Sequence, residues 1–300
     1  MRLVLGLTAT QLSTLINDFT ALWLSGSAEK GQSFSLLGCV VAYPLWEGAV
    51  SHLFYAQRLY QLPLGVLGIS LATAIYPVMS TDAAKKDFDA LIKTISRGTG
   101  CALFVAIPAT AGIFLVARPL ICVLFQHGSF TSADTSVVAW TLSFYAAGLS
   151  GYFLQQIMTR ALYSLQDSKT PALSAGAAVL ANLTLNLTLI WFMGTGGLAA
   201  ATALCSYLQV AILLVVLRRR LGHSILDGLR PAMVKTIIAT AVMCAAGVMI
   251  LILMSGLPAG RFYELLRLAV VVPTAAGVYL LVARVLRIEM LSLLTSGKGH

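Results

Sequence analysis

Residues 55–80 read YAQRLYQLPLGVLGISLATAIYPVMS, and Arg58 is the only charged residue in this stretch. A membrane-spanning helix needs about 20 mostly apolar residues, and this stretch is long enough to supply one. It predicts a membrane helix near 50–79 that is longer than a bilayer requires, so we expect a tilt, a kink or an extension beyond the lipid. Pro63 and Pro77 are expected to bound or bend this helix, because proline removes a backbone donor.

The composition of the whole chain agrees with an integral membrane protein. Of the 300 residues, 58% are hydrophobic and 10% are charged, and the mean hydropathy is +0.88. Soluble domains carry about 25% charged residues, so a soluble fold is disfavoured. The net charge of +9 does not come from a basic stripe interleaved with aromatics, so nucleic acid is not an expected partner. The five cysteines form no CxxC pair and are expected to be small core residues.

Eight apolar runs predict an all-α polytopic bundle with about eight transmembrane helices. They lie near 3–24, 50–79, 98–117, 135–160, 171–193, 198–217, 232–255 and 266–286. Lysine and arginine concentrate in alternate connections, namely 80–97, 160–170, 218–235 and the C-terminal tail. Basic loops face the cytoplasm in membrane proteins, so the pattern predicts that both termini are cytoplasmic.

Two connecting segments contain apolar residues but are not predicted to span the membrane. Residues 25–49 contain an apolar patch that is too short to span a membrane, which indicates an outer-face loop or a re-entrant hairpin. Residues 83–97 place Phe88, Leu91 and Ile95 on one helical face. That pattern predicts an amphipathic helix on the inner membrane surface.

Sequence motifs for catalysis are absent. The four histidines are far apart in sequence, and no HExxH, GxSxG, P-loop or GxGxxG motif occurs. We therefore expect a protein that is not an enzyme, with no metal and no other cofactor.

Polar residues inside predicted spans are the remaining candidates for function. The first span contains Gln11, Asn17 and Asp18, and the fifth contains Asn182 and Asn186 one helical turn apart. Such residues usually face a bundle interior or a wet cavity. They either line a cavity and take part in ion coupling, or hold neighbouring helices together by hydrogen bonds.

Arg58 is the charge that most needs an explanation, because an arginine near the membrane centre costs at least ~2.5 kcal/mol on insertion scales. It can extend to the outer interface, pair with Asp18 on the preceding helix, or bind an anionic group of a substrate. Its planar guanidinium suits bidentate binding of phosphate. Gln57 and Gln61 flank it and complete the predicted binding set.

Three blocks of the sequence resemble the MurJ/MviN family of lipid II flippases. They are the stretch at 55–80, LFQHGSFTSADT at 124–135 and RALYSLQDSKTPALSA at 160–175, in the family's order and spacing. The resemblance covers nearly the whole chain and is most specific over 50–200. It implies alignment from the family's seventh helix onward. Residues 1–220 would form the second six-helix lobe, and 221–300 would form two additional helices that border a groove for the lipid tail.

The resemblance implies that Arg58 contacts the pyrophosphate of lipid II in the bacterial inner membrane. Membrane lipids, a separate first-lobe polypeptide and proteins of peptidoglycan synthesis are the other implied partners. Gln57 departs from the family pattern, because that position is often acidic in relatives. The first lobe, which supplies further cavity arginines, is not expected in this chain, and alternating access needs two lobes. A non-transporting scaffold and an exporter of another polyprenyl-linked saccharide therefore stay open as alternatives.

Overall fold

A computed structural model describes residues 2–27, 31–36, 39–222, 225, 229–256, 258 and 260–291 of the chain. The side chains of residues 2–12, 34, 36 and 39 lie outside this description. The helices are α1 (Arg2–Trp23), α2 (Ala49–Pro63), α3 (Ser70–Ala84), α4 (Phe88–Phe125), α5 (Ser132–Ala147), α6 (Leu149–Ser164), α7 (Lys169–Met193), α8 (Thr195–Leu221), α9 (Leu229–Leu253) and α10 (Arg261–Val285). A π-helix, η1 (Leu64–Ile69), joins α2 to α3, and β1 (Ser33–Leu36) and β2 (Cys39–Ala42) follow α1.

The predicted all-α membrane bundle is confirmed. Within the described residues, seven helical segments are long and apolar enough to span a bilayer, and they coincide with the second to eighth predicted spans. The first predicted span is also helical, as α1. It is not among those seven segments, in keeping with its polar residues.

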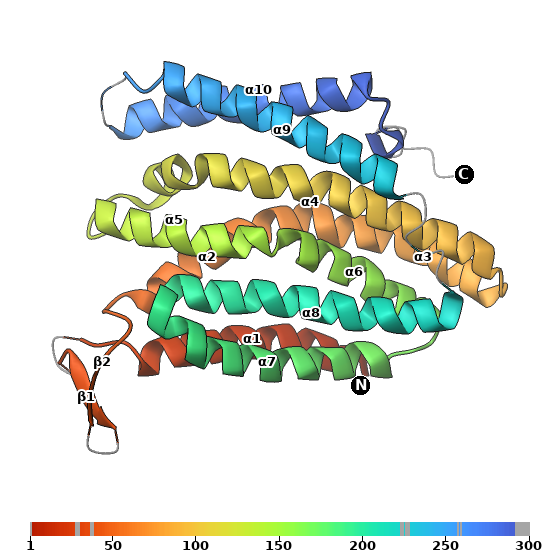
Figure 1. Cartoon of the computed structure of the whole chain (residues 1–300), viewed down its shortest axis with the longest axis horizontal. Coiled ribbons are helices and arrows are strands. Elements are labelled where there is room, and N and C mark those ends of the chain that lie inside the picture. Colours follow the sequence, from red (N-terminus) through yellow and green to blue (C-terminus); the bar gives the residue numbers. More distant parts are fainter. Residues whose placement is uncertain are drawn as a thin grey trace.

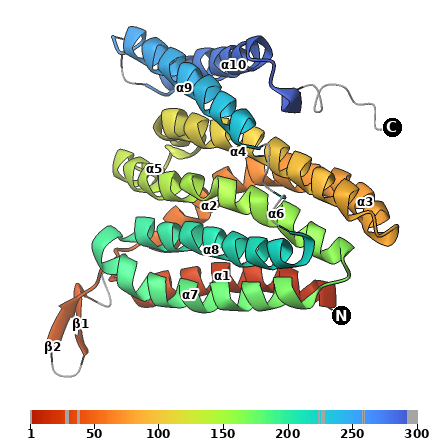
Figure 2. The same ribbon diagram turned by 45° about the vertical axis from the view of Figure 1, so that its right-hand side comes forward.

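Successive spans run in opposite directions, so their connections alternate between two ends of the bundle (Figure 1). The hairpin of β1 and β2 marks one end, here called the hairpin end. The start of α1 and the end of α10 are both at the opposite end, called the basic end, on different sides of the bundle (Figures 1 and 2). The short turn at 85–87, the turn at 165–168 and the arginines that close α8 all belong to the basic end. The alternation of basic loops in the sequence is therefore a real segregation of charge in space.

The buried residues form two hydrophobic clusters. The larger cluster joins α1 through α8, and the smaller one joins α4 to α9 and α10. In the smaller cluster the Tyr279 hydroxyl donates a 2.6 Å hydrogen bond to the Phe104 carbonyl oxygen. The pair α9–α10 thus lies on one side of α4, as both ribbon views show (Figures 1 and 2).

Glycines bring α6 close to α8 in the larger cluster. A Cβ added to Gly148, between α5 and α6, would lie 2.8 Å from the Ala203 Cβ, and one added to Gly151 would lie 2.3 Å from the Ser206 Oγ. Small residues permit such close approach between membrane helices, where lipid gives little hydrophobic drive for association. Side chains at these positions would force α6 and α8 apart.

The segment at 25–49 contains strands, which the sequence analysis did not predict. β1 and β2 pair antiparallel, with Ser33 opposite Ala42 and Phe34 opposite Val41. The hairpin projects away from the bundle in both views (Figures 1 and 2), so the re-entrant interpretation is wrong. Valines 40 and 41 favour a strand because they are β-branched.

The predicted surface helix at 83–97 is also wrong. α3 continues to Ala84, and α4 begins at Phe88 and runs without a break into the third span. Leu91 and Ile95 are fully buried in the larger cluster. Their apolar face packs against neighbouring helices, because an amphipathic pattern does not distinguish a protein neighbour from a lipid surface.

Candidate functional site

Arg58 lies on the exposed face of α2, in line with Phe54 and Leu62 one turn away on either side. The side chains of Phe54 and Leu62 are 49% and 67% exposed. The Arg58 guanidinium carbon lies 4.8 Å from the centre of the Phe54 ring, a cation–π contact. No hydrogen bond or ion pair from another described residue reaches it. Among the described residues its donors are therefore without a hydrogen-bonding partner.

Gln57 has a different environment from Arg58. It is 7% exposed, and its Nε2 donates a 3.1 Å hydrogen bond to the Tyr145 hydroxyl on α5. Successive helical residues differ by about 100° in direction, so Gln57 points into the bundle while Arg58 points out. Gln61 is half-buried at the edge of the exposed face. Of the two predicted glutamines, only Gln61 has a direction compatible with sharing a ligand with Arg58.

The backbone changes its helical form directly after this turn. α2 ends at Pro63, and the chain continues as the π-helix η1 before α3 begins at Ser70. Proline lacks a backbone donor and disturbs the regular ladder. The predicted bend at Pro63 thus takes the form of a π-helix, and such segments occur frequently at functional sites.

The amides in the first and fifth predicted spans form one buried network. Asn17 of α1 donates to the Thr202 hydroxyl of α8 at 2.9 Å. Asn186 of α7 donates to the Asn17 Oδ1 at 2.7 Å and to the Asn182 Oδ1 at 3.1 Å. All three asparagines are at most 1% exposed. The network connects three helices and does not line an open surface, which is what the interhelical interpretation predicts.

Asp18 and Gln11 complete the predicted set on α1. Asp18 is half-buried, and its Oδ1 is buried without a hydrogen-bond partner among the described residues. Asp18 forms no ion pair with Arg58 in the described part of the chain, whose ion pairs involve other residues. The pairing interpretation of Arg58 is therefore wrong. The Gln11 side chain lies outside the described residues.

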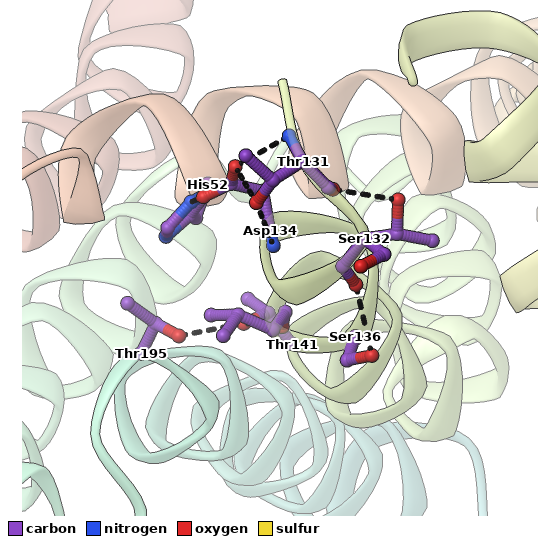
Figure 3. Close-up of polar contacts among 9 residues, drawn as sticks. His52, Thr131, Ser132, Asp134, Ser136, Thr141 and Thr195 are labelled. Carbon is purple, nitrogen blue, oxygen red and sulfur yellow. Dashed lines mark hydrogen bonds and ion pairs between the residues drawn. The ribbon is translucent and has the colours of Figure 1, made fainter. Parts of the chain in front are cut away.

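A polar cluster at the hairpin end was missed by the sequence analysis. The Asp134 carboxylate accepts hydrogen bonds from the Thr131 amide and hydroxyl, and lies 2.8 Å from the His52 Nε2 (Figure 3). Thr131 and Asp134 form a capping box at the start of α5. The Thr131-x-x-Asp134 spacing before an apolar run was a readable signal of that cap, whereas the partner His52 lies 82 residues away.

This cluster holds the hairpin ends of several spans together. His52 belongs to α2 and Asp134 to α5, and the nearby hydroxyls of Thr141 and Thr195 join α5 to α8 at 2.7 Å (Figure 3). The block at 124–135 therefore has a structural explanation. Thr131 and Asp134 in this block cap the backbone amides at the start of α5, and Asp134 also connects α5 to α2 through His52.

The block at 160–175 forms the corresponding junction at the basic end. Asp167 accepts hydrogen bonds from the amides of Lys169 and Thr170 at the start of α7. It also forms a 2.7 Å ion pair with Arg220 at the end of α8. Burial alone would raise the pKa of Asp167, but the hydrogen bonds from Thr170 and the charge of Arg220 outweigh burial and hold it below its ordinary value of 3.8.

The described residues contain no group of three or more His, Cys, Asp or Glu that could hold a metal ion. The arrangement offers instead an exposed guanidinium, stacked on an aromatic ring, on a membrane helix. Such a group can bind an anion by charge-assisted hydrogen bonds.

Comparison with known proteins gives matches along most of the chain. The sequence family described as "Lipid II flippase MurJ" matches residues 2–267. A probable lipid II flippase MurJ of Vibrio cholerae serotype O1 is 36% identical over 178 residues, which cover 59% of this chain and 34% of that protein. A protein of the same name from Buchnera aphidicola subsp. Acyrthosiphon pisum is 28% identical over 290 residues, which cover 96% of this chain and 53% of that protein. The chain thus spans about a third to a half of the length of these relatives.

Solved structures share the fold. Lipid II flippase MurJ in an inward closed conformation superposes with a TM-score of 0.64 and 24% identity, over 79% of this chain and 47% of that one. A MATE protein in its bent conformation gives a TM-score of 0.57 and 14% identity, over 98% of this chain and 66% of that one. At these identities the likeness concerns the fold alone.

Proposed function

Because this chain belongs to the family of the lipid II flippase MurJ, we propose that it forms the second lobe of a flippase that carries lipid II across the bacterial inner membrane. The chain is a multi-pass membrane protein with seven apolar spans among its described residues. Its role is transport and not catalysis. The cargo would be an undecaprenyl-diphosphate lipid, which unites a double anion with a long apolar tail.

The proposal rests on the environment of Arg58, an exposed charge without a counter-ion among the described residues. Arg58 lies on an exposed face between apolar side chains, with its guanidinium over an aromatic ring and without a hydrogen bond or ion pair to another described residue. A charge held in that position without a counter-ion is costly in a membrane, and a diphosphate would supply the missing anion. Arginine is suited to this contact because its planar fork can bind two phosphate oxygens at once. Gln61 is the second residue that we assign to the cargo.

We further propose a division of the chain into two parts and an orientation. Residues 1–220 form the lobe, and 221–300 form an added pair of helices that pack on α4. The basic end faces the cytoplasm, by the excess of lysine and arginine there, and so do both termini. Asp18, the acid within the first predicted span, is our candidate for coupling to an ion, because its Oδ1 is buried without a described partner.

One lobe offers half of a cargo site, so the proposal includes a first-lobe partner. Transporters of this kind work by rocking of one repeat against the other around a shared site. The partner would be a separate polypeptide or a preceding part of the same protein. The exposed face of α2, with Arg58 at its centre, is where we place the shared cavity. Other proteins of peptidoglycan synthesis are possible further partners of the assembled transporter.

Complementation tests this function. The chain would be expressed in bacteria depleted of their own lipid II flippase, alone and together with the N-terminal half of a relative. We expect rescue of growth only with the N-terminal half, and loss of that rescue with Arg58→Ala at an unchanged level of protein in the membrane. Arg219→Ala, which removes an exposed charge at the end of α8, is the matched control and should preserve rescue.

The other outcomes have distinct meanings. Full rescue by Arg58→Ala would contradict the assignment of Arg58 to the cargo. Failure of rescue with every N-terminal half tested would favour the scaffold function. Rescue of export of a different polyprenyl-linked saccharide, and not of lipid II, would keep the transport mechanism and change the cargo.

A further inference from the structure

A cavity of about 630 Å³ lies at the hairpin end, where the lobe meets the pair α9–α10. It is separate from Arg58 and from the amide network. Among described residues, its polar lining comprises Arg118, Gln126, Ser132, Thr135, Ser255, Glu264 and Arg267. Its apolar lining includes Leu115, Pro119 and Leu251. One wall therefore suits a charged group, and another suits hydrocarbon.

The arginines at this cavity are unusual for their end of the molecule. The described connections and helix ends at the hairpin end carry few basic residues, in contrast to the basic end. Two of the few, Arg118 and Arg267, line this one cavity. A third, Arg261, lies beside it and donates from its Nε to the Val123 carbonyl oxygen at 3.0 Å. This concentration of charge is not explained by membrane orientation.

Arg267 and Arg118 differ in what they already bind. Arg267 forms an ion pair with Glu264 and donates to the Met254 carbonyl oxygen, so its position is fixed within the cavity wall. Arg118 is exposed, and no described residue makes a hydrogen bond or ion pair with its guanidinium. The two arginines and Glu264 leave the described lining with a net charge of +1. That charge matches a monoanion.

The depth of Arg118 matches the level of lipid headgroups. α4 has 38 residues, so at ~1.5 Å per residue it is ~57 Å long and is longer than the ~30 Å hydrocarbon core. Its residues 98–117 carry no charge and lie between Arg97 and Arg118, and such a stretch has about the 20 residues that cross the hydrocarbon. Arg118 precedes the last residue of α4, Phe125, by about two turns, or ~10 Å. Its guanidinium therefore lies near the boundary between headgroups and hydrocarbon, with Leu115 one turn deeper.

We propose that this cavity binds the phosphodiester of an anionic bilayer phospholipid, with Arg118 as its principal charge contact. Phosphatidylglycerol has the required chemistry, because its single phosphodiester carries one negative charge. Its glycerol hydroxyls can bond to Ser132 and Ser255, and its acyl chains can follow Leu115 and Leu251 into the membrane. The lipid would lie between the lobe and the pair α9–α10, which also pack against each other in the smaller hydrophobic cluster. This inference does not depend on the proposed transport function.

Native mass spectrometry of the purified full chain tests the proposal. The probes are phosphatidylglycerol, phosphatidylcholine, inorganic phosphate and water-soluble glycerophosphoglycerol, each titrated separately. We expect saturable binding of one phosphatidylglycerol at least tenfold tighter than phosphatidylcholine. Arg118→Gln should weaken it about tenfold, as expected for loss of a charge-assisted hydrogen bond. Arg118→Lys, which keeps the charge, should weaken it no more than about threefold.

A matched control uses a second exposed arginine at the opposite end of the bundle. Arg284 lies at the other end of α10, outside the cavity, so Arg284→Gln should leave phosphatidylglycerol affinity unchanged. Equal loss with Arg118→Gln and Arg284→Gln would overturn the proposal, because it would indicate nonspecific attraction. Binding of inorganic phosphate or glycerophosphoglycerol as tightly as of phosphatidylglycerol would also overturn it, in favour of a soluble anion. Equal affinity for phosphatidylcholine, which is zwitterionic, would also overturn it, because the cavity would then not select an anionic lipid.

Discussion

Arg58 and the asparagine network are both polar features of membrane helices, and their surroundings are opposite. The three asparagines are buried, and hydrogen bonds connect them to one another across α1 and α7 and to Thr202 of α8. Arg58 is exposed, and the Phe54 ring contacts its guanidinium, to which no other described residue makes a hydrogen bond or ion pair. A neutral amide can be satisfied by other side chains inside the bundle, whereas an unpaired charge needs water or an anion. The comparison separates residues that hold the lobe together from a residue placed for a ligand.

If the asparagine network holds the helices together, removing Asn186 should cause the largest loss of stability among the variants described here. Asn186→Leu removes two hydrogen bonds and leaves the Asn17 and Asn182 oxygens without that donor. We expect a loss of about 2 kcal/mol in the free energy of unfolding, from the two lost hydrogen bonds and the two buried oxygens that lose their donor. Thermal unfolding in detergent measures it. Thr184→Val, on the exposed side of the same helix, should change little, and an equal effect of both variants would refute the structural role of the network.

A substitution of Arg58 by lysine tests whether the ligand role of Arg58 requires the guanidinium or only its positive charge. Arg58→Lys keeps the charge and loses the bidentate fork, so we expect the flipping rate of the assembled transporter to fall about tenfold, equivalent to about 1.4 kcal/mol. The free energy of unfolding should stay within about 0.5 kcal/mol, as for exposed positions generally. A lipid II accessibility assay on the two membrane faces measures flipping. Wild-type flipping by Arg58→Lys would mean that charge alone suffices.

Gln57 tests whether neighbours in sequence share a role. Gln57→Leu deletes the hydrogen bond to the Tyr145 hydroxyl in a buried place, and should cost about 1 kcal/mol of stability. Flipping at permissive temperature should remain close to wild type. Ser51→Ala, at an exposed position of the same helix, serves as the control. A loss of flipping with full stability would instead assign Gln57 to the cargo beside Arg58.

The smallest expected effect concerns Asp167, where a charge is paired within the protein. Its pKa in the folded chain is lowered, so its stabilising contribution is present above pH 3.8 and is lost as the pH falls through the lower folded value. Asp167→Asn should cost about 1 kcal/mol or less at pH 7, and the difference from wild type should begin to shrink below pH 3.8 and vanish only once the pH lies below the lowered folded pKa. Thermal unfolding at pH 7 and in a series from about pH 4 down to about pH 2 measures this. Asp89→Asn, at an exposed position of α4, should show neither effect, and a pH-independent difference at Asp167 would contradict the ion-pair explanation.

Several properties were readable in the sequence. Hydropathy predicted the spans, because a helix that crosses lipid must satisfy its backbone internally and present apolar side chains over its length. The alternation of basic connections predicted which loops share an end. The three blocks that resemble the MurJ/MviN family predicted the family, and the match over residues 2–267 confirms it. These are local or periodic signals, so no knowledge of distant contacts was needed.

Tertiary structure alone decided what each polar residue faces. The sequence predicted Arg58 and Gln57 as parts of one binding set and left the role of Asn17 and Asp18 open between a cavity and interhelical bonding. Packing then buried Asn17 against α7 and α8, turned Gln57 toward Tyr145 on α5, and left Arg58 exposed. The pairing of His52 with Asp134, and the meeting of Arg118 with Arg267 at one cavity, join residues far apart in sequence. Such contacts depend on how whole helices pack, and the period of a single helix does not encode them.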